Sequence, residues 1–353
     1  MAYTTIAKPS DHFDCPTWDG SDSTTTVNGM GFKPDALWVK KYTAAGASIF
    51  NNSTLGVAKN WKTTDYSATT DTATYVASYT SDGFTLTGNK ADTNDAGQKY
   101  FSSCWKANGG TTASNTTGSI NSTVQANTTS GFSIVKWTGT GANGTIGHGL
   151  GVAPKIIIAK NGSTANTGAS LNMSKMFVTD PQEDFMQFAW NPSLLARNTN
   201  DRWNDTAPTT SVFSVGSTVQ LNGSNGECIA YCFAEVQGFS KFGYYTGNGN
   251  VNGPTIYCGF RPKWILVKNT TRTEDWAVKV SGLTGYGLGG QRTRTTKLGD
   301  TDSSTNATVN FESTGFRPTT TDSKVNEDGD LHFYMAFAEM PTVGTNGTIA
   351  LAT

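Results

Sequence analysis

The chain has 353 residues, whereas a typical domain has about 100–150, so two or three domains are expected. Only 15% of the residues are charged and the net charge is −1, which provides no electrostatic attraction to nucleic acid or to an anionic membrane. The N-terminus lacks a signal-peptide pattern and no apolar run is long enough to span a membrane, so the sequence predicts cytoplasmic synthesis without membrane insertion.

The first predicted elements belong to a unit that recurs later in the chain. A short opening segment, Phe13–Gly20, is followed by Gly31-x-x-Pro34, which sets a turn. The next run is apolar on both faces, as is typical of a covered strand, and it ends at Lys40, where we expect the chain to meet water. A polar turn over 94–97 precedes the closing strand over 101–105, which predicts a hairpin.

A segment rich in Ser, Thr, Asn and Gly follows over 107–130, and this composition predicts a long loop or linker. The second copy then repeats the order of the first. It has an opening strand over Gly131–Gly141, a Gly-x-x-Pro strand over Gly151–Asn161, a polar turn over 222–226 and a closing strand over 230–235.

The third copy keeps the register of the second. Gly238 lies 238 − 131 = 107 residues after Gly131, and Gly259 lies 259 − 151 = 108 residues after Gly151. A turn over 326–330 and a closing strand over 334–339 complete it. Two elements that keep nearly the same offset indicate a true internal repeat.

Short strands, Gly/Pro/Asn turns and scarce helical periodicity predict an all-β fold of three tandem β-sandwich (jelly-roll-like) repeats of about 105–125 residues. The expected units are residues 1–130, which include the 107–130 loop, residues 131–237, and residues 238–353, which include a C-terminal tail. A linear and a pseudo-threefold arrangement both fit the sequence.

Several motifs resemble active-site signatures and are better explained by the repeat. Gly139-Thr140-Gly141-Ala142-Asn143-Gly144 spells G-x-G-x-x-G, but no helix follows it to bind a phosphate. Ser133 and Ser240 recur at equivalent strand positions, which favours architecture over a hydrolase nucleophile. The histidines lack ligand spacing, and the odd number of cysteines predicts buried thiols. We therefore predict no catalytic residue, cofactor or metal ligand.

Three weaker possibilities stay open. Glu235 and Glu339 close equivalent strands and would suit glycoside cleavage if they met, although separate, solvated strand ends are expected. The oxygen-rich turn Asn326–Asp330 suits a hard cation such as Ca²⁺ or a plain solvated turn. Arg292, Arg294 and Lys297 form a small basic segment.

Exposed aromatic side chains bind sugar rings and partner proteins through large rigid contacts. The candidates for partner or glycan contacts are therefore Arg292, Arg294 and a set of aromatic residues. These aromatic residues are Trp61, Tyr66, Trp190, Trp203, Tyr244, Tyr245 and Tyr286.

The block from Tyr231 to Gly249, running into Gly259-Phe260-Arg261-Pro262 and a strand that contains Trp264, resembles repeat-containing virion proteins of tailed bacteriophages of aquatic bacteria. The resemblance is best over 131–269 and names no catalytic residues. It implies a component of the virion, whose partners are other virion proteins and further copies of the same chain.

This resemblance leads to three hypotheses. The first is a tail or fibre component that acts in host attachment and contacts a host surface glycan. The second is a capsid decoration or head-fibre protein, because the same rigid β composition suits both locations. The third is an enzyme that degrades host polysaccharide.

Overall fold

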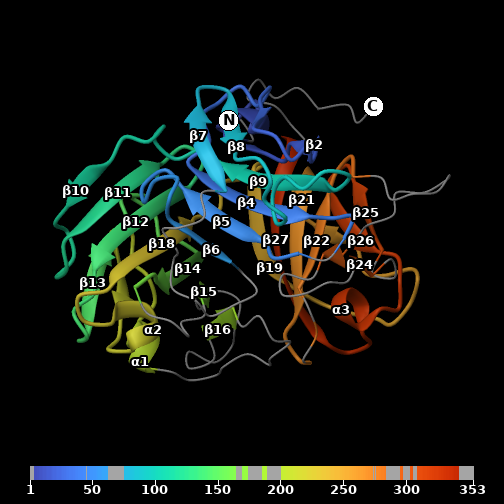
Figure 1. Cartoon of the computed structure of the whole chain (residues 1–353). Coiled ribbons are helices and arrows are strands. Elements are labelled where there is room, and N and C mark those ends of the chain that lie inside the picture. Colours follow the sequence, from blue (N-terminus) through green and yellow to red (C-terminus); the bar gives the residue numbers. More distant parts are fainter. Residues whose placement is uncertain are drawn as a thin grey trace.

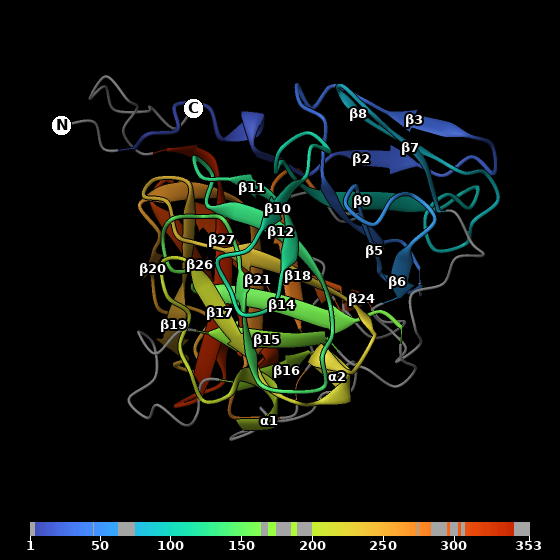
Figure 2. The same cartoon turned by 90° about the vertical axis from the view of Figure 1, so that its left-hand side faces the viewer.

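A computed structural model describes residues 4–44, 46–62, 75–163, 169–173, 185–188, 200–272, 274, 276–283, 295–296, 303–304 and 308–341. The predicted all-β fold is confirmed. Every strand pair is antiparallel, and the described helices are single turns. Figures 1 and 2 show three groups of sheets packed around a common centre.

The first unit consists of a large central sheet and a smaller outer sheet. A 3₁₀ turn, η1 (Pro9–Asp11), precedes its strands, which are β1 (Phe13–Asp14), β2 (Thr17–Asp19), β3 (Thr25–Val27), β4 (Ala36–Lys41), β5 (Ile49–Asn52), β6 (Asn60–Lys62), β7 (Val76–Thr80), β8 (Gly83–Leu86) and β9 (Lys99–Trp105). The central sheet has the order β1-β9-β4-β5-β6, with β2 also paired to β9, and the outer sheet has the order β3-β8-β7.

The second unit repeats this plan and enlarges it. Its elements are β10 (Ala113–Asn115), β11 (Ser122–Asn127), β12 (Phe132–Thr138), β13 (Gly144–Gly147), β14 (Ile156–Asn161), β15 (Ala169–Met173), β16 (Phe185–Phe188), α1 (Asn200–Trp203), β17 (Val212–Val215), α2 (Val219–Asn222) and β18 (Glu227–Phe233). The central sheet has the order β10-β11-β12-β18-β14-β15-β16, and β13 pairs with β17 in the outer sheet. The expected 107–130 loop is therefore partly a hairpin that extends this sheet.

The third unit has the same connectivity. Its elements are β19 (Ser240–Thr246), β20 (Ile256–Tyr257), β21 (Phe260–Asn269), β22 (Ala277–Val280), β23 (Thr295–Thr296), β24 (Ser303–Ser304), β25 (Val309–Glu312), β26 (Gly315–Pro318), α3 (Ser323–Asn326) and β27 (Leu331–Pro341). The central sheet has the order β19-β27-β21-β22, the outer sheet has the order β20-β26-β25, and β23 pairs with β24.

Each central sheet is apolar on both faces because alternate residues enter different cores. In β21, Trp264 and Leu266 enter a core shared by all three units, while Ile265 and Val267 face the outer sheet of their own unit. The same alternation holds in β4 and β14. Two-faced apolar strands are thus explained by an outer sheet on one side and the other two units on the opposite side.

Equivalent aromatic residues from the three closing strands meet at the centre. Trp105, Phe233 and Phe337 pair across their sheets with Ala36, Ile156 and Trp264, which are each the fifth residue after the glycine of a Gly-x-x-Pro turn. The ring centroids of the three closing-strand aromatics are 5.7, 5.9 and 6.0 Å apart. This nearly equilateral triangle marks a pseudo-threefold axis, so the units form a ring and not a linear array.

Two local expectations were wrong. Lys40, Lys160 and Lys268 do not emerge into water but are buried, with exposed fractions of 3%, 0% and 4%. The Lys268 ammonium donates to the carbonyl oxygens of Asn269 and Arg272, at 2.7 and 3.2 Å. Its long apolar stem therefore packs in the sheet while its charged end binds the backbone of the next loop.

The polar turns before the closing strands are not hairpin turns either, because β8, β17 and β26 lie in the outer sheets and the turns cross to the central ones.

A fully buried asparagine in each of these turns holds the crossover in place. The residues are Asn94, Asn222 and Asn326. The Asn222 side chain accepts hydrogen bonds from the Trp137 indole (3.1 Å) and the Thr140 amide (3.2 Å), and it donates to the carbonyl oxygens of Ala142 (2.7 Å) and Gly216 (3.1 Å). One amide side chain thus replaces the backbone partners that this loop lacks.

We expect Asn222→Ala to lower the free energy of unfolding by about 3 kcal/mol, because buried donors and acceptors lose their partners without gaining water. Chemical denaturation measures the change. Asn121→Ala, at an exposed site in the same unit, is the control and should alter stability by less than about 0.5 kcal/mol. Equal effects of the two substitutions would contradict a role for Asn222 as the clamp of the crossover.

Candidate functional site

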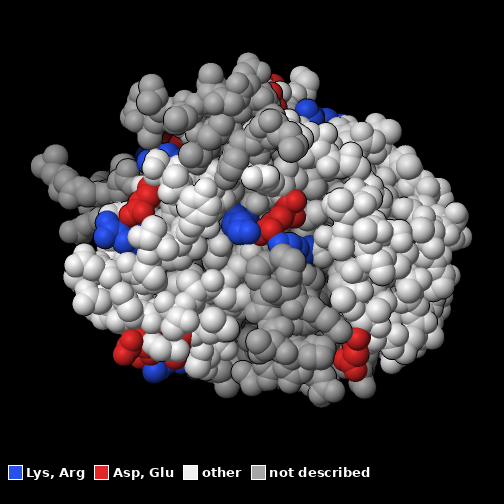
Figure 3. All heavy atoms as spheres, turned by 180° about the vertical axis from the view of Figure 1, so that it is seen from behind, with Lys and Arg blue, Asp and Glu red and all other residues white. Residues whose placement is uncertain are grey.

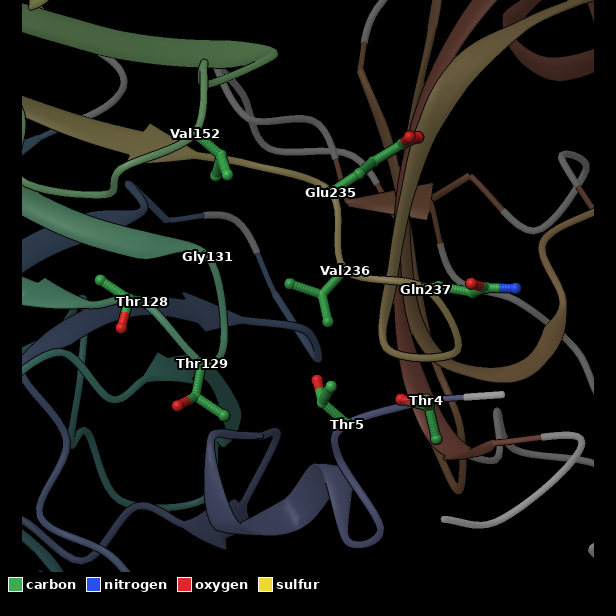
Figure 4. A pocket seen from close by; sticks show the side chains of 9 residues that line it. All are labelled: Thr4, Thr5, Thr128, Thr129, Gly131, Val152, Glu235, Val236 and Gln237. Carbon is green, nitrogen blue, oxygen red and sulfur yellow. The ribbon is translucent and has the colours of Figure 1, made fainter. Parts of the chain in front are cut away.

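A groove lies where the second unit meets the third and the N-terminal segment. Its volume is about 500 Å³, and Figure 4 shows the residues that line it, which are Thr4, Thr5, Thr128, Thr129, Gly131, Val152, Glu235, Val236 and Gln237. We call it the junction groove. Its walls include the chain that leaves β18 and the turn between β11 and β12.

Tight backbone turns position the walls of the groove. Gly131 has a φ of +68°, and a Cβ there would lie 2.5 Å from the carbonyl oxygen of Ala234, so only glycine fits. The chain passes from β18 to β19 in a turn in which the Ser240 hydroxyl accepts from the Val236 amide at 3.0 Å. Val236 and Gln237 are thereby held at the surface between two units.

The acidic residue of the groove is neutralised by its neighbours. The Glu235 carboxylate pairs with Lys155, lies 3.3 Å from the Lys241 ammonium, and accepts from the Phe242 amide at 2.8 Å. In Figure 4 its side chain points away from the threonines. The groove therefore presents hydroxyl and methyl groups, which suit hydrogen bonding and apolar contact with an uncharged polar ligand.

Glu235 and Glu339 do not form a catalytic pair in their present contacts. The Glu339 carboxylate accepts from Arg261 and from the Ser281 hydroxyl, each at 2.9 Å, within the third unit. Both glutamates occupy the equivalent end of a closing strand, but each is partly buried in its own ion pair and neither is a solvated strand end. The glycosidase interpretation has no geometric support from these contacts.

The predicted aromatic contacts fall into two groups. Trp61 and Trp203, predicted to be exposed, are buried, with exposed fractions of 4% and 0%. Tyr244 packs against the shared core and Tyr245 donates to the carbonyl oxygen of Val325, so these are structural as well. The remaining candidates lie outside the described residues, and they are Tyr66, Trp190, Tyr286, Arg292, Arg294 and Lys297.

Trp61 joins two units instead of facing a partner. Its ring stacks on Tyr231 of the second unit, with centroids 6.2 Å apart and an angle of 2° between the planes. The Lys160 ammonium lies 5.4 Å from the same ring. Trp61 therefore holds the first and second units together through its buried apolar surface and through a cation–π contact.

Sequence reasoning missed the apolar side chains that are exposed. Tyr257 is 62% exposed and Val152 is 50% exposed. The signal was available in the aligned repeats, because Val152 stands where the other units have the buried residues Phe32 and Phe260. A residue that differs from its counterparts in the other units is not needed for the packing that the units share. An exposed apolar side chain at such a position is therefore a candidate for contact with a partner.

Other motifs serve the fold. Arg272 pairs with Asp330 (2.6 Å) and Glu327 (2.9 Å), so a protein cation already binds two of the three carboxylates of the acidic turn, and no cluster of metal-binding side chains occurs within the described part of the chain. A Cβ on Gly139 would lie 2.2 Å from the Gly223 carbonyl oxygen, and Gly20 and Gly247 make the same close approach in their units. The first glycine of the G-x-G-x-x-G pattern therefore allows a close backbone contact that recurs in every unit.

The histidines and cysteines are structural in the same way. His148 and His332 are buried and their rings bond to backbone carbonyl groups, such as the Thr209 oxygen at 3.1 Å from His148 Nε2. Burial lowers the pKa of both. All five cysteines are free and buried, as predicted.

Lys279 is an unusual cation inside the third unit. It is 5% exposed, its ammonium has no hydrogen-bond partner among the described residues, and it lies 4.9 Å from the centre of the Phe311 ring. Desolvation, reinforced by Arg261, lowers the pKa of Lys279 to about 8. At neutral pH, the protonated Lys279 ammonium in the folded protein therefore lowers the free energy of unfolding.

We expect Lys279→Met to raise the free energy of unfolding at neutral pH by about 1–3 kcal/mol, because it keeps the apolar stem and removes the buried charge. The unfolded chain binds the proton more tightly than the folded one, so this cost disappears as the pH rises from about 8 to above 10. Denaturation at several pH values checks both points. Lys8→Met, on an exposed lysine, is the control, and a gain that did not shrink with pH would count against the explanation.

The chain belongs to the protein family DUF7483, described as a domain of unknown function, whose family model matches residues 8–341. No curated protein and no solved structure is significantly similar to it. Among the described residues, no helix has the length and apolar character that crossing a bilayer requires.

Proposed function

We propose that the chain is a non-enzymatic structural protein of a tailed bacteriophage particle, located in the tail or fibre apparatus, with a role in host attachment. The shared aromatic core carries the proposal. Because residues of all three units pack into one cluster, the units form a rigid block and not a string of hinged domains. Rigidity under load is what a particle component needs, and the resemblance of 131–269 to virion proteins supports the same class.

Contacts across every pair of units reinforce this block. Trp38 of the first unit lies 6.1 Å from Trp264 of the third, Phe50 lies 5.4 Å from Tyr231 of the second, and the Asn52 amide donates to the Tyr231 hydroxyl at 2.8 Å. Phe233 of the second unit lies 6.0 Å from Phe337 of the third. Relative movement of any unit would break several of these contacts.

Immunogold labelling of intact virions tests the location. We expect particles labelled on the tail or fibres, with antibody pre-absorbed on purified protein as the control. Labelling confined to the head shell would overturn the tail assignment and support a capsid decoration or head-fibre protein instead.

The non-enzymatic part of the proposal has its own test. Purified protein is incubated with capsule or lipopolysaccharide of the host, and released oligosaccharides are measured. We expect no release. Release that disappears in Glu235→Gln or Glu339→Gln would overturn the proposal, because those carboxylates would then act in catalysis.

Tyr257 is the described side chain best suited to a host glycan, because it combines an aromatic ring with 62% exposure. We expect Tyr257→Ala to weaken binding of the protein to host cells by about 5–30-fold, which corresponds to about 1–2 kcal/mol, without changing thermal stability. Tyr257→Phe keeps the ring and serves as the matched control. Unchanged binding by the alanine variant would rule this residue out as a contact.

A further inference from the structure

The β10–β11 hairpin is an addition to the plan that the units share. In the third unit the opening strand β19 is the edge of its central sheet, and in the first unit the opening segment β1 holds the same position. In the second unit β11 pairs with the equivalent strand β12 over six residues, and β10 pairs with β11. Its strand β11 packs Val124 into the core of the second unit, whereas β10 adds a further strand that the other two units lack.

The strand β10 is an open sheet edge. Among the described strands it has a neighbour on one side only, and Ala113 and Ser114 are exposed. Natural proteins protect such edges with lysine, proline or a bulge, because the unpaired backbone groups attract another strand. β10 has the protection of being short, with three residues, but it carries none of these other devices. No charged residue or proline occurs over 107–135, and the β10–β11 register has no bulge.

Apart from the Lys33 ammonium, which lies next to Gly110, the surroundings of the hairpin are also poor in charge. Exposed residues next to β10 are small and polar, and they are Thr111, Thr112, Thr116, Thr117 and Ser119. Seen from behind, the side of the molecule that the second unit forms, at the right of Figure 3, has very few charged side chains. Depletion of charged residues distinguishes protein interfaces from ordinary surface.

These features fit a second copy of the same chain. We propose that β10 pairs antiparallel with β10 of a second copy, across a twofold axis near Ser114, and joins two seven-stranded sheets into one. A twofold contact places each residue near its own counterpart, so any charge on the strand would repel itself. A charge-free strand avoids this, its backbone edge is self-complementary, and opposed Ser and Thr hydroxyls can bond across the junction.

The proposal specifies how the copies expected in the proposed particle meet, and it can fail while the tail location stands. Sedimentation of the purified full chain over a range of concentrations tests it. We expect a concentration-dependent dimer for the wild type and a monomer for Ser114→Lys, with the same thermal midpoint at concentrations where the wild type is monomeric. Ser114→Ala, and Thr26→Lys on the edge strand β3 of the first unit, are the controls and should stay dimeric.

Cross-linking tests the register directly. All five native cysteines are buried, so Ser114→Cys introduces a single exposed thiol. We expect mild oxidation to give a disulfide-linked dimer. A wild-type chain that is monomeric at every concentration overturns the proposal, and so does a dimer that Ser114→Lys leaves intact. A dimer in which the Ser114→Cys variant fails to cross-link overturns the pairing about Ser114.

Discussion

Phe337→Ala should lower the free energy of unfolding by about 3–5 kcal/mol, which is the usual cost of truncating a buried phenylalanine. The site lies in the core that all three units share. The Phe337 ring stacks on Phe13 of the first unit, with centroids 4.7 Å apart, and it lies 6.0 Å from Phe233 of the second unit. Within its own unit it lies 5.8 Å from Phe242 and 5.9 Å from Trp264.

The manner of unfolding is as informative as the size of the loss. Because the cavity opens in a core shared by three units, we expect amides in β4, β14 and β21 to lose hydrogen-exchange protection together. Val251→Ala, on a side chain that is 60% exposed, is the control and should leave the stability within about 0.5 kcal/mol of the wild type. Loss of protection confined to the third unit would show that the units fold independently.

The repeat and its two-faced strands were predictable from the residues themselves. Gly-x-x-Pro followed by an apolar run identifies a strand covered on both sides, and the structure places that pattern in β4, β14 and β21. The assignment of Phe13–Gly20 as the opening of the first copy is supported by the structure, in which Trp18 takes the place of Trp137 and Tyr245. Each of the three donates a hydrogen bond to the turn before its closing strand, to the Thr93 carbonyl oxygen, Asn222 and the Val325 carbonyl oxygen respectively.

The ring of units could not be predicted in the same way. A strand that is apolar on both faces must be covered twice, but its residues do not say whether the second cover is a third sheet or a neighbouring unit. The triangle of Trp105, Phe233 and Phe337 depends on contacts between residues more than a hundred positions apart. Local periodicity reports none of these contacts.

The candidate site was harder to predict because composition misleads in two places. Trp61 was expected at the surface, whereas it is buried in a contact with Tyr231 that joins the first and second units. The 107–130 segment was expected to be a loop, because Ser, Thr and Asn are typical of loops. They form β10 and β11 here, since the neighbouring strand β12 offers backbone partners that outweigh weak intrinsic propensity. Exposed Tyr257 and the charge-free edge become evident only once the strands are placed.

Raising the pH should unfold the protein, because burial raises the pKa of all five cysteine thiols above the ordinary value. For Cys228 the pKa rises to about 12, and desolvation is the main cause in every case. An acid whose folded pKa is raised contributes stability that is complete below its unfolded pKa, about 8.5–9, and is lost as the pH rises above it. The loss is about 1.4 kcal/mol per thiol per pH unit.

Five such thiols together lose about 7 kcal/mol per pH unit, against a total stability of about 5–15 kcal/mol for an ordinary fold. We therefore expect cooperative unfolding at about pH 10–11, followed by circular dichroism, with thiolate absorbance appearing in the same transition. Buried tyrosines add to the effect above pH 10, since burial raises the pKa of Tyr100 to about 12. Replacing Cys228 and Cys232 by alanine should make the dependence of stability on pH shallower. Thiolates that form well before unfolding would instead mean that these side chains reach water in the folded protein, and the desolvation that links them to stability would be absent.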